Sequence, residues 1–264
     1  MYEHHKQALD KLTETLRTDP SILAVITAGS VAQGKARESS DVDVYLVVDD
    51  KSYAERKKSY NLAYINHDKE ICDYEGGYID GKIIDLRFLE QAAKRGSEPT
   101  RYSFVGSRAW FSRIPDLDAL LARIPVYPEA NRDRNIRDFF AQIVLHGFFF
   151  AAEATKKNNP YLLAHSASQL ALFGGRLILA HNRILFPCHK SLMMAVENAP
   201  EKPDGFIEMA NDLLRNPTDK KCKNFAGMLL GFRDPGFDPQ LSTAIFMENN
   251  EWNWLDGEPP LSDR

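Results

Sequence analysis

Two aspartates lie one residue apart in a run of apolar, mostly β-branched residues. Asp41 and Asp43 open the segment DVDVYLVV, whose composition is typical of a buried strand. Alternate side chains of a strand share a face, so the two carboxylates lie on one side, about 7 Å apart along the chain. Such carboxylates repel each other unless a cation lies between them, and magnesium prefers carboxylate oxygens together with phosphate. The spacing therefore predicts a magnesium site.

A glycine and a serine precede this pair, with ten residues between. Gly29 follows the apolar run ILAVITA, and Ser30 comes next. Glycine tolerates a positive φ and lets the backbone approach other groups closely. The Ser30 hydroxyl and the amides after it can hold a phosphate oxygen. A phosphate cradle beside a metal site indicates a nucleoside triphosphate as the ligand.

A third acid follows in the segment YIDGKIIDLRFL. Its Asp80-Gly81 pair, between β-rich runs, predicts a two-residue hairpin turn. On the second strand of that hairpin Asp85 and Arg87 share a face, so we expect Asp85 as a third metal ligand and Arg87 as a partner for phosphate. The alternative is a plain ion pair between these two side chains. Three carboxylates can hold two divalent ions, which stabilise both the attacking and the leaving oxygen in a phosphoryl displacement.

The order of these residues resembles a family signature. Ala28-Gly29-Ser30, ten residues and then Asp41-Val42-Asp43-Val44 are similar to the motif of the nucleotidyltransferase superfamily, whose fold is shared with the DNA polymerase beta palm. Gly34 and Ser40 also match what is common in small bacterial members. The resemblance runs in register over residues 22–90. It implies a catalytic, metal-binding set of Asp41, Asp43 and Asp85, and a nucleotide site that includes Gly29, Ser30, Ser40 and Arg87.

The resemblance also implies a reaction. Members of this kind bind ATP or another NTP with two magnesium ions, move the nucleoside monophosphate to a hydroxyl group, and release pyrophosphate. A catalytic domain followed by a helical bundle looks like the antibiotic nucleotidyltransferases of the kanamycin, streptomycin and lincosamide types. A drug-like or sugar-like small molecule with a hydroxyl group is therefore the expected acceptor.

The elements that must position these residues fill the first half of the chain. Strands are expected over residues 22–29 and 41–48, and helices over 3–17 and 51–63. A segment with two prolines and many polar residues, 123–133, is typical of a linker. We therefore expect an α+β protein, in which a mixed-sheet, palm-like nucleotidyltransferase domain (residues 1–125) precedes an α-helical bundle (residues 126–264) that binds the substrate.

The second half offers a candidate base. Its patterns are helical, with long apolar helices expected over residues 137–157 and 161–185. The acceptor hydroxyl must lose a proton, and Glu153 in the first of these helices is the candidate catalytic base, with His146 on the same face. The alternative is that Glu153 marks the solvated end of the helix and that His146 is a satisfied core histidine.

A rival function rests on Arg176 and His181. Their spacing is that of the R-x-x-x-x-H motif of HEPN-type ribonucleases, which are helical bundles that often accompany small nucleotidyltransferases as toxin and antitoxin. Leu177 stands where a polar residue is usual in that motif. RNA cleavage by the helical half, or nucleotidyl transfer to RNA or protein, are therefore the alternatives to a small-molecule acceptor.

Composition limits the remaining classes. Hydrophobic residues form 44% and charged residues 27% of the 264-residue chain, as in soluble globular proteins. The net charge of −4 does not indicate a polyanion-binding protein, so nucleic acid is not the expected partner, although a local basic groove is compatible with it. Three cysteines without a C-x-x-C pair fit a reducing compartment. The apolar stretches fall short of the ~18 residues of a membrane span. We expect a cytoplasmic monomer or homodimer without a membrane partner.

Overall fold

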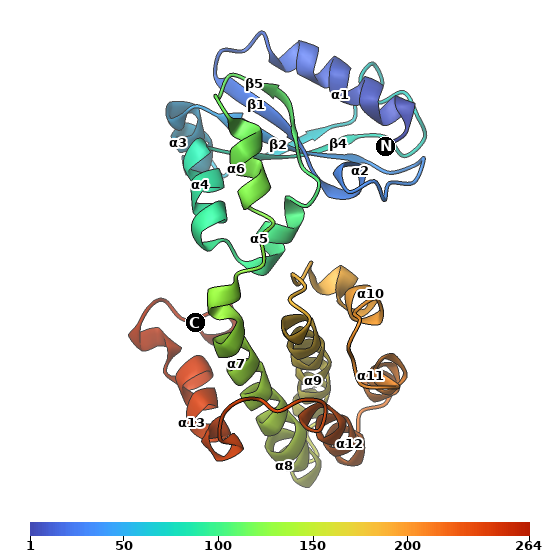
Figure 1. The fold of residues 1–264 in the computed structure, drawn as a ribbon, viewed down its shortest axis with the longest axis vertical. Coiled ribbons are helices and arrows are strands. Elements are labelled where there is room, and N and C mark those ends of the chain that lie inside the picture. The colour runs from blue at the N-terminus through green and yellow to red at the C-terminus, as the bar shows by residue number, and fades with distance from the viewer. The chain divides into compact units, whose positions relative to one another are not determined.

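The computed structural model describes residues 1–264, which form two compact units, Met1–Tyr127 and Pro128–Arg264. The division lies close to the boundary expected from the proline-containing segment. Each unit has its own hydrophobic core and is described by itself (Figure 1).

A mixed five-stranded sheet forms the centre of the N-terminal unit, with the strand order β3-β4-β2-β1-β5. The central strands β2 and β4 run parallel, whereas the other neighbouring pairs are antiparallel. Together with the helical second unit, this sheet confirms the expected α+β class. The strands are β1 (Ile22–Thr27), β2 (Val42–Val48), β3 (Ala63–Asn66), β4 (Ile79–Ile84) and β5 (Ala109–Ser112). The helices are α1 (Glu3–Leu16), α2 (Gly29–Ala32), α3 (Asp50–Lys58), α4 (Leu86–Arg95), α5 (Glu98–Ser103) and α6 (Leu117–Arg123).

Strand β2 contributes alternately to both faces of the sheet, as its sequence predicts. Val44 and Leu46 are buried in the core that includes Leu9 of α1. Tyr45 and Val47 are buried in the opposite core, which α4 and α6 help to form. Because alternate residues share a face, Asp43 points to the same side as Tyr45.

The predicted hairpin at Asp80-Gly81 is wrong. Both residues lie inside β4, which pairs in parallel with β2 and antiparallel with β3. The glycine is needed because a Cβ at position 81 would lie 2.8 Å from the carbonyl oxygen of Tyr64 on the neighbouring strand β3. Close approach of two strands, rather than a turn, therefore explains Gly81.

The C-terminal unit is helical. The helices α7 and α8 and the π-helical segment η2 between them form one continuous helix, against which the long helix α9 packs. Their contact surface carries apolar residues such as Ile143, Leu170 and Ile178, all fully buried. The elements are α7 (Arg132–Val144), η2 (Leu145–Phe150), α8 (Ala151–Lys156), α9 (Pro160–His181), α10 (Leu192–Glu197), α11 (Phe206–Arg215), α12 (Asp219–Leu230) and α13 (Ser242–Phe246), with short 3₁₀ turns between some of them.

One helix, α9, is long and apolar enough to cross a membrane by length and composition alone. This differs from the expectation that every apolar stretch falls short of that length. Half of the qualifying window is buried inside the structure, and core helices of soluble proteins pass the same test. Length and composition of α9 are therefore weak evidence for a membrane span.

Candidate metal and nucleotide site

Three carboxylates meet on the sheet of the N-terminal unit. Asp41, Asp43 and Asp80 each offer an oxygen, and these oxygens lie within 4.8 Å of one another. The parallel register of β2 and β4 places Asp43 directly beside Asp80, and Asp41 immediately precedes β2. The sheet itself therefore assembles the cluster from two segments that are distant in the sequence.

This donor set fits a magnesium ion. Three half-buried carboxylates at such distances repel one another, and a bound cation removes that repulsion. Oxygens that share one magnesium ion lie at most about 4.2 Å apart, because each metal–oxygen distance is about 2.1 Å. The oxygens of the cluster, all within 4.8 Å of one another, exceed that limit by at most about 0.6 Å.

Gly29 lies against the cluster. Its φ is +62°, and a Cβ on it would lie 1.8 Å from Oδ2 of Asp43. The neighbouring amide of Ala28 donates a hydrogen bond to the Asp43 carbonyl oxygen at 2.9 Å. Position 29 thus requires glycine for its backbone conformation and for the space that Asp43 occupies. The positive φ and the close approach expected from the sequence are both present.

Two serines flank the loop between Gly29 and Asp41. The Ser30 hydroxyl makes no hydrogen bond to another residue, so it is available to a ligand. The Ser40 hydroxyl accepts a hydrogen bond from the Arg37 amide at 2.9 Å, and the Tyr74 hydroxyl donates to the Ser40 carbonyl oxygen at 2.9 Å. Ser40 therefore shapes the turn that leads into Asp41, and its contact with a nucleotide stays a prediction.

A tyrosine that the sequence analysis missed lies beside the cluster. The nearby Asp41 carboxylate raises the pKa of the Tyr78 hydroxyl. The Tyr78 ring stacks on His67, with 5.0 Å between ring centroids. Tyr78 thus stays protonated beside the Asp41 carboxylate. The alternation of Tyr78, just before β4, with Asp80 inside it was the signal that could have identified both.

Asp85 is not part of the cluster, in which Asp80 occupies the place expected for Asp85. Strand β4 ends at Ile84, and Asp85 is the N-cap of α4, where its Oδ1 accepts a hydrogen bond from the Phe88 amide at 2.7 Å. Arg87 lies exposed in the first turn of this helix and forms no ion pair with Asp85. The alternation of a strand does not extend into a helix, so Asp85 and Arg87 do not share a face. Both interpretations, a joint metal and phosphate site and an ion pair, depended on that shared face.

Glu153 lies in α8 of the helical unit. Its carboxylate pairs with Lys157 at 3.1 Å and with Lys156 at 3.6 Å, and these contacts lower the pKa of Glu153. A general base near neutral pH needs the opposite shift. The ion pairs agree with the alternative interpretation, a solvated helix end, and a catalytic role of Glu153 stays a prediction.

His146 is buried in the π-helical segment. Burial and the neighbouring His165 lower the pKa of His146 to about 4, so its ring is neutral at pH 7. The ring packs against His165, Phe150 and Phe246. Its Nδ1 has no hydrogen-bond partner. His146 is thus a core histidine, as the alternative interpretation held, but its hydrogen bonds are not all satisfied.

Arg176 and His181 do not form a common site. The Arg176 guanidinium lies over the rings of Phe139 and Phe186, at 4.6 and 4.4 Å from their centroids. His181 instead lines a cavity with other residues. The arrangement does not support the ribonuclease alternative.

Comparison with known proteins agrees with the site in the N-terminal unit. Residues 10–96 match the family model described as polymerase beta, nucleotidyltransferase. No curated protein matches the chain. A solved structure of a nucleotidyltransferase-like protein from Exiguobacterium sibiricum 255-15 is similar at a TM-score of 0.48 and 13% identity, over 94% of this chain and 80% of that chain. The matched segment contains Gly29, the three clustered aspartates and Tyr78, and it supports the nucleotidyltransferase superfamily for the N-terminal unit.

Proposed function

We propose that the protein is a magnesium-dependent nucleotidyltransferase that moves AMP from ATP to a hydroxyl group of a small molecule and releases pyrophosphate. One observation carries the proposal: Asp41, Asp43 and Asp80 converge beside Gly29, whose backbone contacts the Asp43 carboxylate. This arrangement combines a cation site with a tight glycine-serine turn next to it. A metal-bound triphosphate is the ligand that uses both.

The reaction exchanges one phosphorus–oxygen bond for another. The acceptor oxygen bonds to the α-phosphorus, the bond from this phosphorus to the bridging oxygen of pyrophosphate breaks, and the hydroxyl proton passes to a base. Magnesium held by the three carboxylates would neutralise part of the negative charge of the phosphates.

The residues of the chain position the reactants. Tyr78 places a protonated hydroxyl beside Asp41, and Gly29 leaves room for the Asp43 carboxylate because it has no Cβ. Ser30 offers its unused hydroxyl to a phosphate oxygen. The close approach of Gly29 to Asp43 is in place without the ligand.

The proposed acceptor is a small molecule, in keeping with the resemblance to antibiotic nucleotidyltransferases. Transfer to RNA or protein is the second candidate. The two are separated by incubating the protein with magnesium and α-labelled ATP in the presence of hydroxyl-bearing drugs and sugars, of RNA, or of a protein extract. Label on a small compound supports the first candidate, and label on a polymer supports the second.

A binding experiment tests the catalytic site without knowledge of the acceptor. We expect wild-type protein to bind ATP in a manner that depends on Mg²⁺ or Mn²⁺, and Asp43→Asn to lose this dependence. The Glu208→Gln variant, on the surface of the helical unit, is the control for a generic loss of one carboxylate. Metal-independent ATP binding, or equal binding by Asp43→Asn, would contradict the proposed function.

A further inference from the structure

The helical unit contains a cavity of about 910 Å³ with an excess of positive charge on its walls. Five arginines and three acidic residues line it, in a chain whose net charge is negative. All of these residues belong to the C-terminal unit, whereas the three clustered aspartates belong to the N-terminal unit. The charged lining residues are Arg132, Arg134, Arg137, Arg183, Arg233, Asp133, Glu201 and Asp234.

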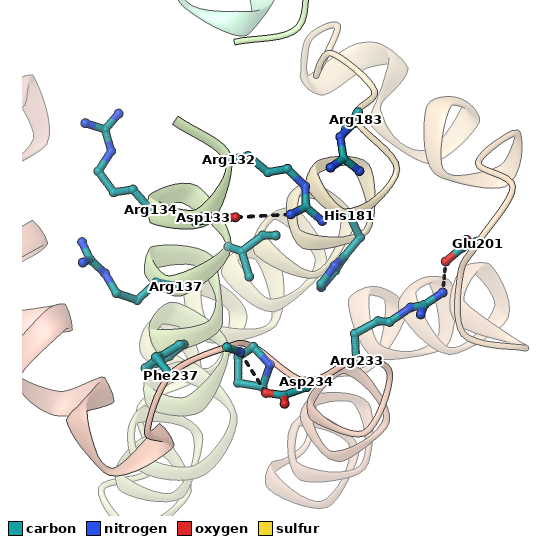
Figure 2. Close-up of a pocket in the computed structure, with 13 residues that line it drawn as sticks. Arg132, Asp133, Arg134, Arg137, His181, Arg183, Glu201, Arg233, Asp234 and Phe237 are labelled. Carbon is teal, nitrogen blue, oxygen red and sulfur yellow. Dashed lines mark hydrogen bonds and ion pairs between the residues drawn. The ribbon is translucent and has the colours of Figure 1, made fainter. Parts of the chain in front are cut away.

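Three of the arginines lie on the same side of α7 as His181 (Figure 2). Arg132 begins α7, Arg183 follows the end of α9, and Arg233 follows α12. Arg134 and Arg137 extend from the other side of α7. Segments that are far apart in the sequence thus contribute guanidinium groups to one cavity.

Arg132 is held in place before any ligand binds. Its Nε donates a hydrogen bond to the Ala180 carbonyl oxygen at 3.1 Å, and its side chain is only 20% exposed. Its Nη1 pairs with Asp133 at 3.2 Å. The remaining N–H groups can donate hydrogen bonds to a ligand in the cavity. A guanidinium fixed in this way presents its donors at little further cost in entropy.

Arg183 occupies a backbone position that favours a different residue. It stands just after α9 with a φ of +54°, where glycine or asparagine is usual at a helix end. Its side chain points into the cavity and pairs with Glu129 at 3.0 Å. The strained backbone suggests that the guanidinium itself is required at this place.

The carboxylates that pair with these arginines are exposed. Asp133 is 96% exposed, and Glu129 and Glu201 are more than half exposed. Such surface ion pairs contribute little to stability, so an anionic ligand can replace the carboxylates as partners of the guanidinium groups. The electrostatic potential at His181 is positive. Burial and the charges of Arg132 and Arg233 lower the pKa of His181 to about 4.

We propose that this cavity binds a small molecule with a phosphate group. Arg132, Arg183 and Arg233 contact the phosphate, because guanidinium forks match its oxygens in geometry and charge. Ile136, Pro235 and Phe237 offer an apolar wall for the remainder of the molecule. The volume is that of a small-molecule site rather than an extended track for a polymer.

The inference concerns the helical unit alone and holds whether or not the proposed nucleotidyl transfer is correct.

Histidine NMR of the full chain tests the proposal, with inorganic phosphate as the probe and chelator present to exclude metal-dependent binding elsewhere. The His181 signal is assigned by its loss in His181→Gln. We expect phosphate to shift this signal saturably and to raise the pKa of His181 toward its ordinary value, because an anion stabilises the protonated ring.

Two variants show whether the arginines cause this effect. The double variant Arg183→Gln/Arg233→Gln is expected to bind phosphate at least about tenfold more weakly, since it loses two charge-assisted contacts. The control Arg215→Gln changes an exposed arginine of α11 outside the cavity and is expected to bind as wild type. If the double variant unfolds, the single variant Arg233→Gln takes its place.

Three results would overturn the proposal. The first is a His181 signal that does not respond to phosphate. The second is an equal loss of affinity in Arg215→Gln, which would mean that the binding is unspecific. The third is a short single-stranded RNA that binds the same arginines far more tightly than phosphate does, which would assign the cavity to nucleic acid.

Discussion

Replacement of Gly29 by alanine tests the contact between the glycine turn and the carboxylate cluster. An alanine at φ +62° costs roughly 1–2 kcal/mol in backbone strain. Its Cβ would also lie 1.8 Å from Oδ2 and 2.4 Å from Cγ of Asp43, so one of the two residues must move. Strand β2 is held in the sheet by the buried residues Val42 and Val44, so the Asp43 carboxylate is the group that yields. We therefore expect Gly29→Ala to lose both stability and metal binding.

The matched control is Gly34→Ala. Gly34 has a φ of +70°, but a Cβ on it would meet nothing within 4 Å. Backbone strain should lower the free energy of unfolding in urea by about 1–2 kcal/mol in both variants, and Gly29→Ala should lose more because its Cβ displaces Asp43. Only Gly29→Ala should lose Mn²⁺ affinity, by more than about tenfold, because a ligand is displaced. The reasoning would be refuted if Gly29→Ala bound Mn²⁺ as tightly as wild type does. It would also be refuted if Gly29→Ala and Gly34→Ala lost Mn²⁺ affinity equally.

Three further predictions concern single side chains. The pKa of His146, about 4 in the folded protein, lies below its unfolded value near 6.5, so the unfolded state binds more protons between these values. Protonation of His146 in the unfolded state should lower the free energy of unfolding by about 2 kcal/mol from pH 7 to pH 5. His146→Gln should remove this part of the dependence of unfolding free energy on pH. An unchanged pH dependence in the variant would argue against a buried neutral ring. Asp85→Ala should lower the free energy of unfolding by about 1 kcal/mol through loss of the α4 cap, whereas Asp85→Asn, which keeps a capping oxygen, should change it little in the same urea titration. Glu153→Gln should leave the rate of nucleotidyl transfer nearly unchanged, because the paired carboxylate is a poor base; a loss of two or more orders of magnitude would restore Glu153 as the base.

Local patterns predicted the part of the site that depends on neighbouring residues. The alternation along Val42–Val48 placed the aspartates on one face, and the apolar run before Gly29 predicted a strand followed by a tight turn. These features depend on steric rules that act over a few residues. They hold in the structure.

The identity of the third acid depends on pairing between distant strands. Asp80-Gly81 has the local form of a hairpin turn, but the parallel pairing with β2 and the close approach of Tyr64 decide its conformation. Asp85 was assigned to a face of a strand that ends one residue earlier, where the chain turns into α4. Neither the register nor the end of the strand is visible in a single sequence.

The arginine-lined cavity was likewise not predictable. Its residues come from the start of α7, the end of α9 and the segment after α12, and no spacing motif connects them. The net charge of the chain indicated the opposite sign. Tertiary packing alone concentrates these cations.

The central claim is that Asp80, and not Asp85, completes the metal site with Asp41 and Asp43. The most direct measurement compares Mn²⁺ binding by Asp80→Asn and Asp85→Asn, which remove the same charge at positions five residues apart. We predict that Asp80→Asn loses Mn²⁺ affinity by at least about tenfold, whereas Asp85→Asn binds as wild type does. Wild-type affinity in Asp80→Asn together with a loss in Asp85→Asn would contradict the account.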